Sequence, residues 1–304
     1  MLSDNSALNQ SATAAASDAQ VFDRGYRHYE GAREGRTHAI RALIGYSIKR
    51  GLGVKKRWTA KIIPILVYGF AFFPVLIIVG IRAFIGAAAS GFGYQSLYDL
   101  LATVLLVFAA ATAPEMLCDD RRQRVLPLYF SRAISRGDYL LAKLGALGIL
   151  MATVSLLPAL ILFLGVTFLA NSPLSYFAHH SADLLRILAA GSLLSIFFAS
   201  IGLVVASFTD RKSVAAAVYI GAIVLVSGLV AALFEAVNAG WHRYLLLLSP
   251  MAIPQYLTSW IFGTKLSGDS AAQAHIAGAW YLVSVAVVVI VCSFVVYRQY
   301  LRDE

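Results

Sequence analysis

The stretch that decides the fold is LYDLLATVLLVFAAATAPEML, residues 97–117, which is followed one residue later by DDRRQRVLPLYFSRAISRGDY, residues 119–139. The first run is about as long as the ~20 apolar residues that take a helix across a bilayer. The second run, which we call the connecting segment, carries five arginines and three aspartates. An apolar run that stops against such a charged segment is typical of a membrane span and the loop beyond it.

Apolar runs of similar length recur along the 304-residue chain. Together they predict six spans, at 62–85, 97–117, 139–169, 184–208, 214–234 and 279–297. Charged residues make up 13% of the chain, about half of the ~25% that is usual in soluble domains. The sequence therefore predicts an all-α integral membrane protein whose transmembrane domain occupies residues 59–304.

Lysine and arginine are distributed unevenly around these spans. Of the 25 such residues, 21 lie in residues 1–61 or 118–143, between the fourth and fifth spans, or after the sixth. Because cytoplasmic loops are rich in these residues, both termini and the connecting segment are predicted to be cytoplasmic, in a multi-pass protein of the plasma (inner) membrane. This distribution also accounts for the net charge of +9 without nucleic acid as a partner.

The residues before the first span divide into two parts. Residues 1–35 are polar, with scattered charges of both signs, and are predicted to form a disordered cytoplasmic tail. Residues 36–58 carry apolar side chains at helical spacing on a basic background, at Ile40, Leu43, Ile44, Ile48 and Leu52. That pattern predicts an amphipathic helix lying on the inner leaflet. The alternative is a basic flank that only orients the first span.

One further stretch, residues 244–262, is apolar enough to be a seventh span. Pro250 and Pro254 interrupt it, and a seventh crossing would place Arg298 and Arg302 outside the cell. We therefore expect short re-entrant helices in the outer loop between the last two spans. Irregular backbone of this kind is found in membranes where it is buried in protein.

Motifs of catalysis and cofactor binding are missing from the sequence. It has no G-x-x-x-x-G-K-[ST] loop for nucleotide phosphates, no H-E-x-x-H and no G-x-S-x-G. The pair His179-His180 has only Asp183 as a nearby ligand and is assigned to a solvated loop. We therefore predict no catalytic, cofactor or metal residues. The carboxylates of the spans, such as Asp99 and Glu115, fall near the predicted span ends rather than at the depth where ion-coupled carriers need them, so transport would be powered from outside this chain.

The connecting segment combines charge with apolar side chains, because VLPLYF at 125–130 follows its first acidic and basic residues. Pro127 suits the first turn of a short helix. Ser135 and Asp138 have the form of a capping box that would begin the third span. An apolar patch rimmed by charge usually marks a protein partner. The alternative, a plain charged connector, explains the arginines but not the exposed apolar residues.

The segment APEMLCDDRRQRVLPLYFSRAISRGDYLLAKL, residues 113–144, resembles the one between the second and third spans in permeases of type-2 ABC exporters. Glu115 matches the acidic residue that ends the second span in that family. Ile134-Ser135-Arg136, Tyr139 and Lys143 match the start of its third span. The order of elements is similar too, with a basic elbow helix, the turn SFTDRKSVAAA at 207–217, and LLSPMAIPQYLTSWIFG at 247–263 in the place of outer re-entrant helices.

This resemblance implies a permease subunit that pairs with a second permease, either a copy of this chain or a paralogue. Separate cytoplasmic P-loop ATPase subunits would hold ATP and Mg²⁺ and dock on the connecting segment, which the family uses as a coupling helix. The residues then expected to contact the ATPase are Arg121, Arg122, Arg124, Leu126, Leu128, Tyr129, Asp210 and Arg211.

The exported substrate is expected to be hydrophobic or lipid-like, because the spans carry almost no charge. Aromatic residues within the spans, such as Phe163, Phe197 and Tyr219, are equally expected to pack helices together, so we assign no substrate residues. The main alternative is a membrane scaffold that recruits a cytoplasmic partner and transports nothing. A membrane-embedded enzyme is a third reading, which the lack of polar groups at depth disfavours.

Overall fold

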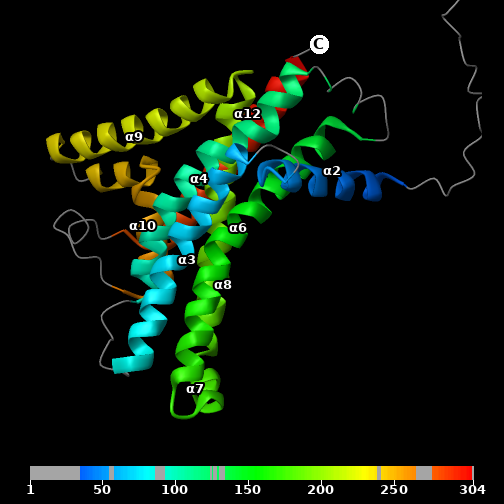
Figure 1. Ribbon diagram of the computed structural model, residues 1–304. Helices are drawn as coiled ribbons and strands as arrows, with labels where there is room; N and C mark the ends of the chain where they lie inside the picture. The colour runs from blue at the N-terminus through cyan, green and yellow to red at the C-terminus, as the bar shows by residue number, and fades with distance from the viewer. Residues whose placement is uncertain are drawn as a thin grey trace, which may run out of the picture. The chain divides into compact units, whose positions relative to one another are not determined.

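The computed structural model describes residues 35–54, 58–85, 93–123, 125, 129, 134–237, 241–264 and 276–302. The described residues form helices and no strand (Figure 1). The elements are α2 (Arg36–Gly51), α3 (Thr59–Ile85), α4 (Tyr94–Arg122), α6 (Arg136–Leu169), α7 (Pro173–His179), α8 (Ser181–Ser207), α9 (Lys212–Ala236), the 3₁₀ helix η2 (His242–Leu248), α10 (Ala252–Phe262) and α12 (Ala279–Arg302). The tail predicted at 1–35 lies, except for Gly35, outside the described residues.

Six of these helices, namely α3, α4, α6, α8, α9 and α12, are long and apolar enough to cross a membrane. Each corresponds to one predicted span, so the predicted fold class is confirmed. The stretch considered as a seventh span forms η2 and α10, whose axes are bent by 100° relative to each other. Such a bend between two short apolar helices fits the predicted re-entrant pair.

Two helices extend beyond the apolar runs from which the spans were predicted: α6 begins earlier and α4 ends later. α6 begins at Arg136, and the predicted capping box is present: the Asp138 amide donates to Ser135 Oγ at 3.2 Å, and the Ser135 amide donates to Asp138 Oδ2 at 3.0 Å. α4, by contrast, continues past the predicted end at 117 as far as Arg122. The first charged residues of the connecting segment therefore belong to α4 rather than to a separate short helix. They remain helical because their side chains have partners on other elements.

The interior of the bundle lies around α4, α6 and α8. In the apolar windows of α4 and α8, 61% of the residues are buried inside the chain, against 17% for α3 and α12. Phe163, Phe197 and Tyr219 are each only 1% exposed, so these aromatic side chains pack helices together. α3 and α12 instead leave most of their apolar surface uncovered by this chain, as expected for helices that face lipid or another subunit.

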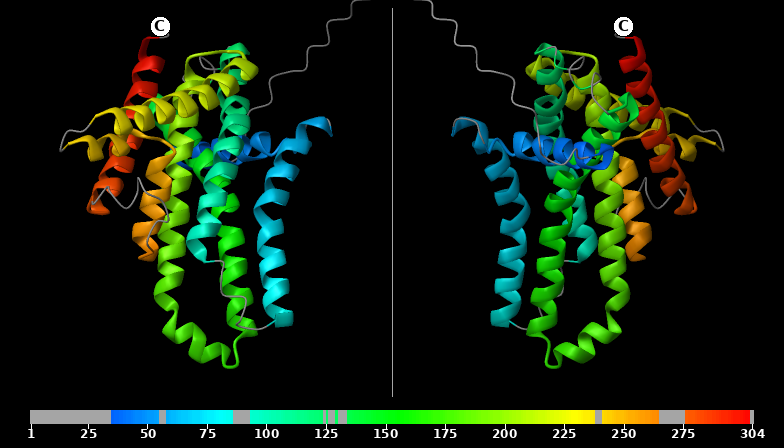
Figure 2. Two further views of the ribbon diagram at one scale, coloured as in Figure 1. Left: turned by 90° about the vertical axis from the view of Figure 1, so that its left-hand side faces the viewer. Right: turned by 90° about the vertical axis from the view of Figure 1, so that its right-hand side faces the viewer.

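Helix α2 runs across the neighbouring spans, and α4 and α6 pass beside it and continue beyond it (Figure 2). It is fastened to them at both ends. Arg36 donates from Nε and Nη2 to the two carboxylate oxygens of Asp138, at 2.8 and 2.6 Å, and Arg50 reaches the last turns of α4. We call the end of the bundle where α2, the last turns of α4 and the first turns of α6 lie the α2 end.

Candidate functional site

Charged side chains from four elements, together with one tyrosine hydroxyl, converge at the α2 end. We call them the ionic cluster, which consists of Arg50 from α2, Glu115, Asp119 and Asp120 from α4, Tyr139 and Lys143 from α6, and Lys212 from α9. The cluster holds three cations and three carboxylates, so their formal charges balance. Two of its carboxylates, Asp119 and Asp120, are the first residues of the connecting segment, where the sequence predicts partner docking.

Asp120 is the centre of the ionic cluster, and its side chain is fully buried. Its Oδ1 accepts from Arg50 Nη1 at 2.5 Å. Its Oδ2 accepts from Lys143 Nζ at 2.7 Å and from the Tyr139 hydroxyl at 2.8 Å. A buried carboxylate is tolerated when charge partners and hydrogen bonds of this kind replace its lost hydration.

Lys143 is the cationic counterpart of Asp120, and its side chain is also fully buried. Besides the aspartate, its ammonium group donates to the carbonyl oxygen of Met116 at 3.0 Å. Met116 and Asp120 are one turn apart on α4, so this single side chain of α6 contacts two successive turns of α4. This contact fixes the first turns of α6 against the last turns of α4.

Two bridging cations extend the cluster to α2 and α9. Arg50 Nη2 lies 2.8 Å from Asp119 Oδ2, and Lys212 Nζ lies 2.7 Å from the same oxygen. Lys212 also donates to Glu115 at 2.9 Å. α9 begins at Lys212. The first residue of α9 is therefore tied to Glu115 and Asp119, which lie one turn apart on α4.

Two of the predicted docking residues contact each other. Arg121 Nε lies 3.1 Å from a carboxylate oxygen of Asp210, and its guanidinium also donates to the carbonyl of Ser207. Arg121 therefore joins the end of α4 to the turn between α8 and α9. The next residues in the sequence, Arg122 after Arg121 and Arg211 after Asp210, are both exposed.

Tyr129 is the one described residue from the apolar part of the predicted docking surface. Its ring lies 5.9 Å from that of Tyr139, a member of the ionic cluster. Its amide donates to the Val125 carbonyl at 3.2 Å, and burial raises the pKa of its hydroxyl. Arg124, Leu126 and Leu128 lie outside the described residues.

Sequence reasoning missed the ionic cluster, although one signal pointed to it. Lys143 stands within the apolar run of the third span, where an ionisable residue is costly and needs a named partner. Asp119 and Asp120 supply acidic groups at the end of the preceding span. The contributions of Arg50 and Lys212, 70 and 97 positions away from their α4 partners, had no comparable local signal.

Metal ligands do not gather anywhere in the described part of the chain: no three His, Cys, Asp or Glu side chains lie close enough to hold an ion. His179 is hydrogen-bonded through Nδ1 to the Ser175 carbonyl at 2.7 Å. The His180 ring stacks on Tyr176 with 4.0 Å between centroids. Both histidines thus make local helical contacts in or beside α7.

Comparison with known proteins adds one finding. A family model described as "ABC-2 family transporter protein" matches residues 2–300, which is almost the whole chain. A search of curated proteins found no match.

Proposed function

Because the chain belongs to the ABC-2 family of transporter proteins, we propose that it is the permease subunit of an ATP-driven exporter. Family membership makes it a multi-pass membrane transport component that associates with an ATPase subunit. In the proposal the α2 end faces the cytoplasm of a cell bounded by the plasma (inner) membrane. ATP and Mg²⁺ bind to the partner, and this chain holds no cofactor.

The observation that carries the proposal is the position of the ionic cluster at the base of the connecting segment. The cluster joins α2, α4, α6 and α9 through buried charge pairs. Breaking such pairs one partner at a time is strongly unfavourable, so the four elements should move as one body. A partner that pushes on the connecting segment would then move four elements together.

We assign the contact with the ATPase to two neighbouring surfaces. The first is the connecting segment, with Arg122 and Arg124 attracting the partner and Leu126, Leu128 and Tyr129 inserting into it. The second is the α8–α9 turn with Arg211. Arg121 and Asp210 join the two surfaces through their ion pair, so that the two surfaces would move together when the ATPase moves. Coupling further requires that the two nucleotide states of the ATPase bind these surfaces differently.

A hydrophobic or lipid-like substrate remains part of the proposal. The packing between α4, α6 and α8 is made of apolar and small side chains such as Phe163, Phe197 and Gly191, which offers no charge to an ionic solute. We further propose that a second permease, a copy or a paralogue, covers part of the apolar surface that α3 and α12 leave exposed.

The test begins with gentle extraction of the tagged chain from its native membrane and identification of the proteins that co-purify. ATP hydrolysis by the complex is then compared with that of the double variant Leu128→Ala/Tyr129→Ala. The matched control is Tyr244→Ala/Leu248→Ala, which removes the same two residue types from exposed positions on η2.

We expect a stoichiometric P-loop ATPase with the wild type and the control, and its loss or altered hydrolysis with the double variant. A preparation that yields a different partner and no ATPase would favour the scaffold and contradict the proposal. If the ATPase co-purifies with the double variant and hydrolyses ATP as it does with the wild type, the assigned docking surface is wrong, although the proposal of an exporter is not contradicted.

A further inference from the structure

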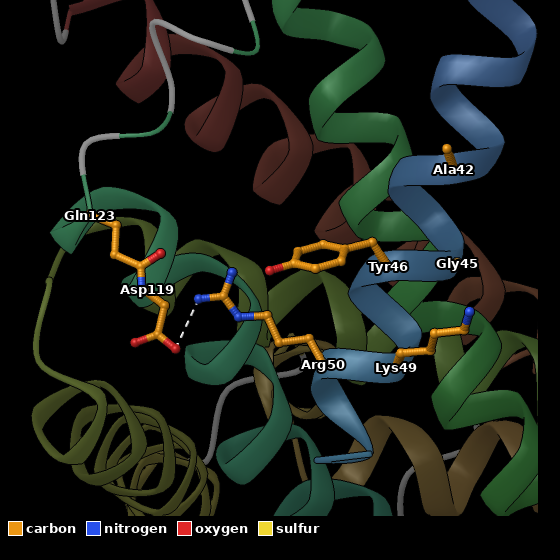
Figure 3. A pocket seen from close by; sticks show the side chains of 7 residues that line it. All are labelled: Ala42, Gly45, Tyr46, Lys49, Arg50, Asp119 and Gln123. Carbon is orange, nitrogen blue, oxygen red and sulfur yellow. Dashed lines mark ion pairs between the residues drawn. The ribbon is translucent and has the colours of Figure 1, made fainter. Parts of the chain in front are cut away.

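We propose that a pocket between α2 and the end of α4 binds the phosphate of an anionic phospholipid from the adjoining leaflet. The pocket has a volume of about 550 Å³ (Figure 3), within the range of roughly 300–1,000 Å³ that is usual for small-molecule sites. It adjoins the proposed ATPase contact, because Asp119 and Gln123 belong to the connecting segment, but the proposal does not depend on ATP-driven export.

Two small residues on one face of α2 leave the space open. Ala42, Gly45, Tyr46 and Lys49 follow each other at helical spacing and line the pocket together. A Cβ atom placed on Gly45 would meet nothing within 4 Å. The space beside Gly45 is therefore open, and a larger residue there would extend into the pocket without a clash at its Cβ.

The far side of the pocket is formed by Asp119 and Gln123 from α4, together with Arg50. Tyr46 and Arg50 point from α2 toward α4, and Lys49 extends from the other side of the same helix (Figure 3). Arg50 is held by Asp119 and Asp120, so it forms a fixed wall. The pocket thus presents the Tyr46 hydroxyl and the Gln123 amide, which can donate to phosphate oxygens, and Lys49, which also lines it, adds an exposed positive charge beside it.

The cations of α2 fall into two classes, and this difference points to the ligand. Arg36 and Arg50 are paired with carboxylates of α6 and α4. Arg41 and Lys49 are exposed and form no ion pair with a described residue. With Lys49 and Arg50 set against Asp119, the pocket has a formal charge of +1, which complements the single negative charge of a phosphodiester.

The position of α2 favours a lipid as the source of that phosphate. The helix is amphipathic and basic, and it runs across the spans rather than along them (Figure 2). Both features are typical of helices that lie at the headgroup level of a bilayer. Basic pockets at that level, between membrane helices, bind the headgroups of anionic lipids.

The test is a titration of the purified full-length chain in detergent with phosphatidylglycerol, followed by native mass spectrometry to count bound lipid, with phosphatidylcholine as the uncharged comparison. The variants are Gly45→Leu, which adds an apolar side chain to the pocket without changing its charge, and Lys49→Ala, which removes an exposed cation from its lining. Arg41→Ala is the charge-matched control. Gly228→Leu is the control for the added side chain, because a Cβ on Gly228 also meets open space.

We expect one tightly retained phosphatidylglycerol and no comparable phosphatidylcholine in the wild type. Retention should be about fivefold weaker in Gly45→Leu and Lys49→Ala, and within about twofold of wild type in both controls. Equal losses in Lys49→Ala and Arg41→Ala, with none in Gly45→Leu, would mean general surface attraction and overturn the proposal. Displacement of the lipid by inorganic phosphate at the same concentration would assign the pocket to a soluble anion and overturn the lipid assignment.

Discussion

Helix α6 is joined to its neighbours by charge at the α2 end and by small residues farther along its length. At the α2 end, Lys143 and Asp120 pair in full burial. Farther along, Ser155 Oγ lies 2.9 Å from Ser195 Oγ of α8 and donates to the Gly191 carbonyl at 3.0 Å. The comparison teaches that one bundle uses two kinds of contact, whose responses to substitution should differ in size and in kind.

We call the part of the bundle beyond the ionic cluster, from about Ala113 of α4 and away from the α2 end, the deeper region, and small residues let its helices approach each other closely. A Cβ on Gly202 of α8 would lie 3.0 Å from the Cβ of Ala113 on α4, a distance at which one of the two must shift. Close approach of this sort is the main source of helix association in lipid, where burial of apolar surface gives no advantage over lipid contact. The deeper region therefore depends on shape, whereas the α2 end depends on paired charge.

The largest effect should come from removing one partner of the buried pair. Lys143→Met leaves Asp120 buried without its ammonium partner, and we expect the free energy of unfolding to fall by about 3–5 kcal/mol. Thermal unfolding of the purified protein in detergent measures the change. Adding Asp120→Asn should recover part of the loss, because it removes the buried carboxylate that has lost one of the two cations described beside it, Lys143 and Arg50. No recovery in the double variant would show that shape rather than charge dominates at the α2 end.

A smaller effect is expected where a side chain is forced into the close contact between α8 and α4. Gly202→Leu should lower the free energy of unfolding by about 1–3 kcal/mol, the usual range for overpacking. Gly228→Leu, at a position with open space, is the control and should leave the melting temperature nearly unchanged. Similar melting temperatures for both variants would contradict the close packing between these helices.

The hydrogen bonds of the deeper region should matter less than its shape. Ser155→Ala removes the bonds to Ser195 and Gly191, and we expect a loss of about 0.6 kcal/mol, the average for such bonds inside membrane proteins. Denaturant titration in mixed micelles resolves a change of this size. A loss as large as that of Lys143→Met would remove the distinction between the two regions.

The smallest effect should come from the ion pair at the start of α2. Arg36 is 63% exposed in its side chain although its partner Asp138 is nearly buried, and water screens such pairs. Arg36→Ala should therefore change the melting temperature little, and what change there is should shrink as salt is added. A salt-independent loss would mean that the pair is shielded from water, as the ionic cluster is.

The sequence predicted most of the fold because membrane spans are marked by the length of their apolar runs. The capping box at Ser135 and Asp138 and the bent pair η2–α10 were also readable locally, from a spacing and from two prolines. The ionic cluster was not, since Arg50 and Lys212 reach α4 from 70 and 97 positions away. The pocket could not be predicted either, because its lining residues come from α2 and from the end of α4, which are distant in the sequence.

The measurement that most directly tests the central claim, that the ionic cluster makes the α2 end one body, is a distance between α2 and α4 in two nucleotide states. Spin labels at the exposed positions Arg41 on α2 and Val107 on α4, with Cys118 and Cys292 replaced, would report it by pulsed electron resonance in the complex with its ATPase. We predict the same narrow distance with and without trapped ATP, and a broadened distance after Lys143→Met. A nucleotide-dependent change with the cluster intact would contradict the claim.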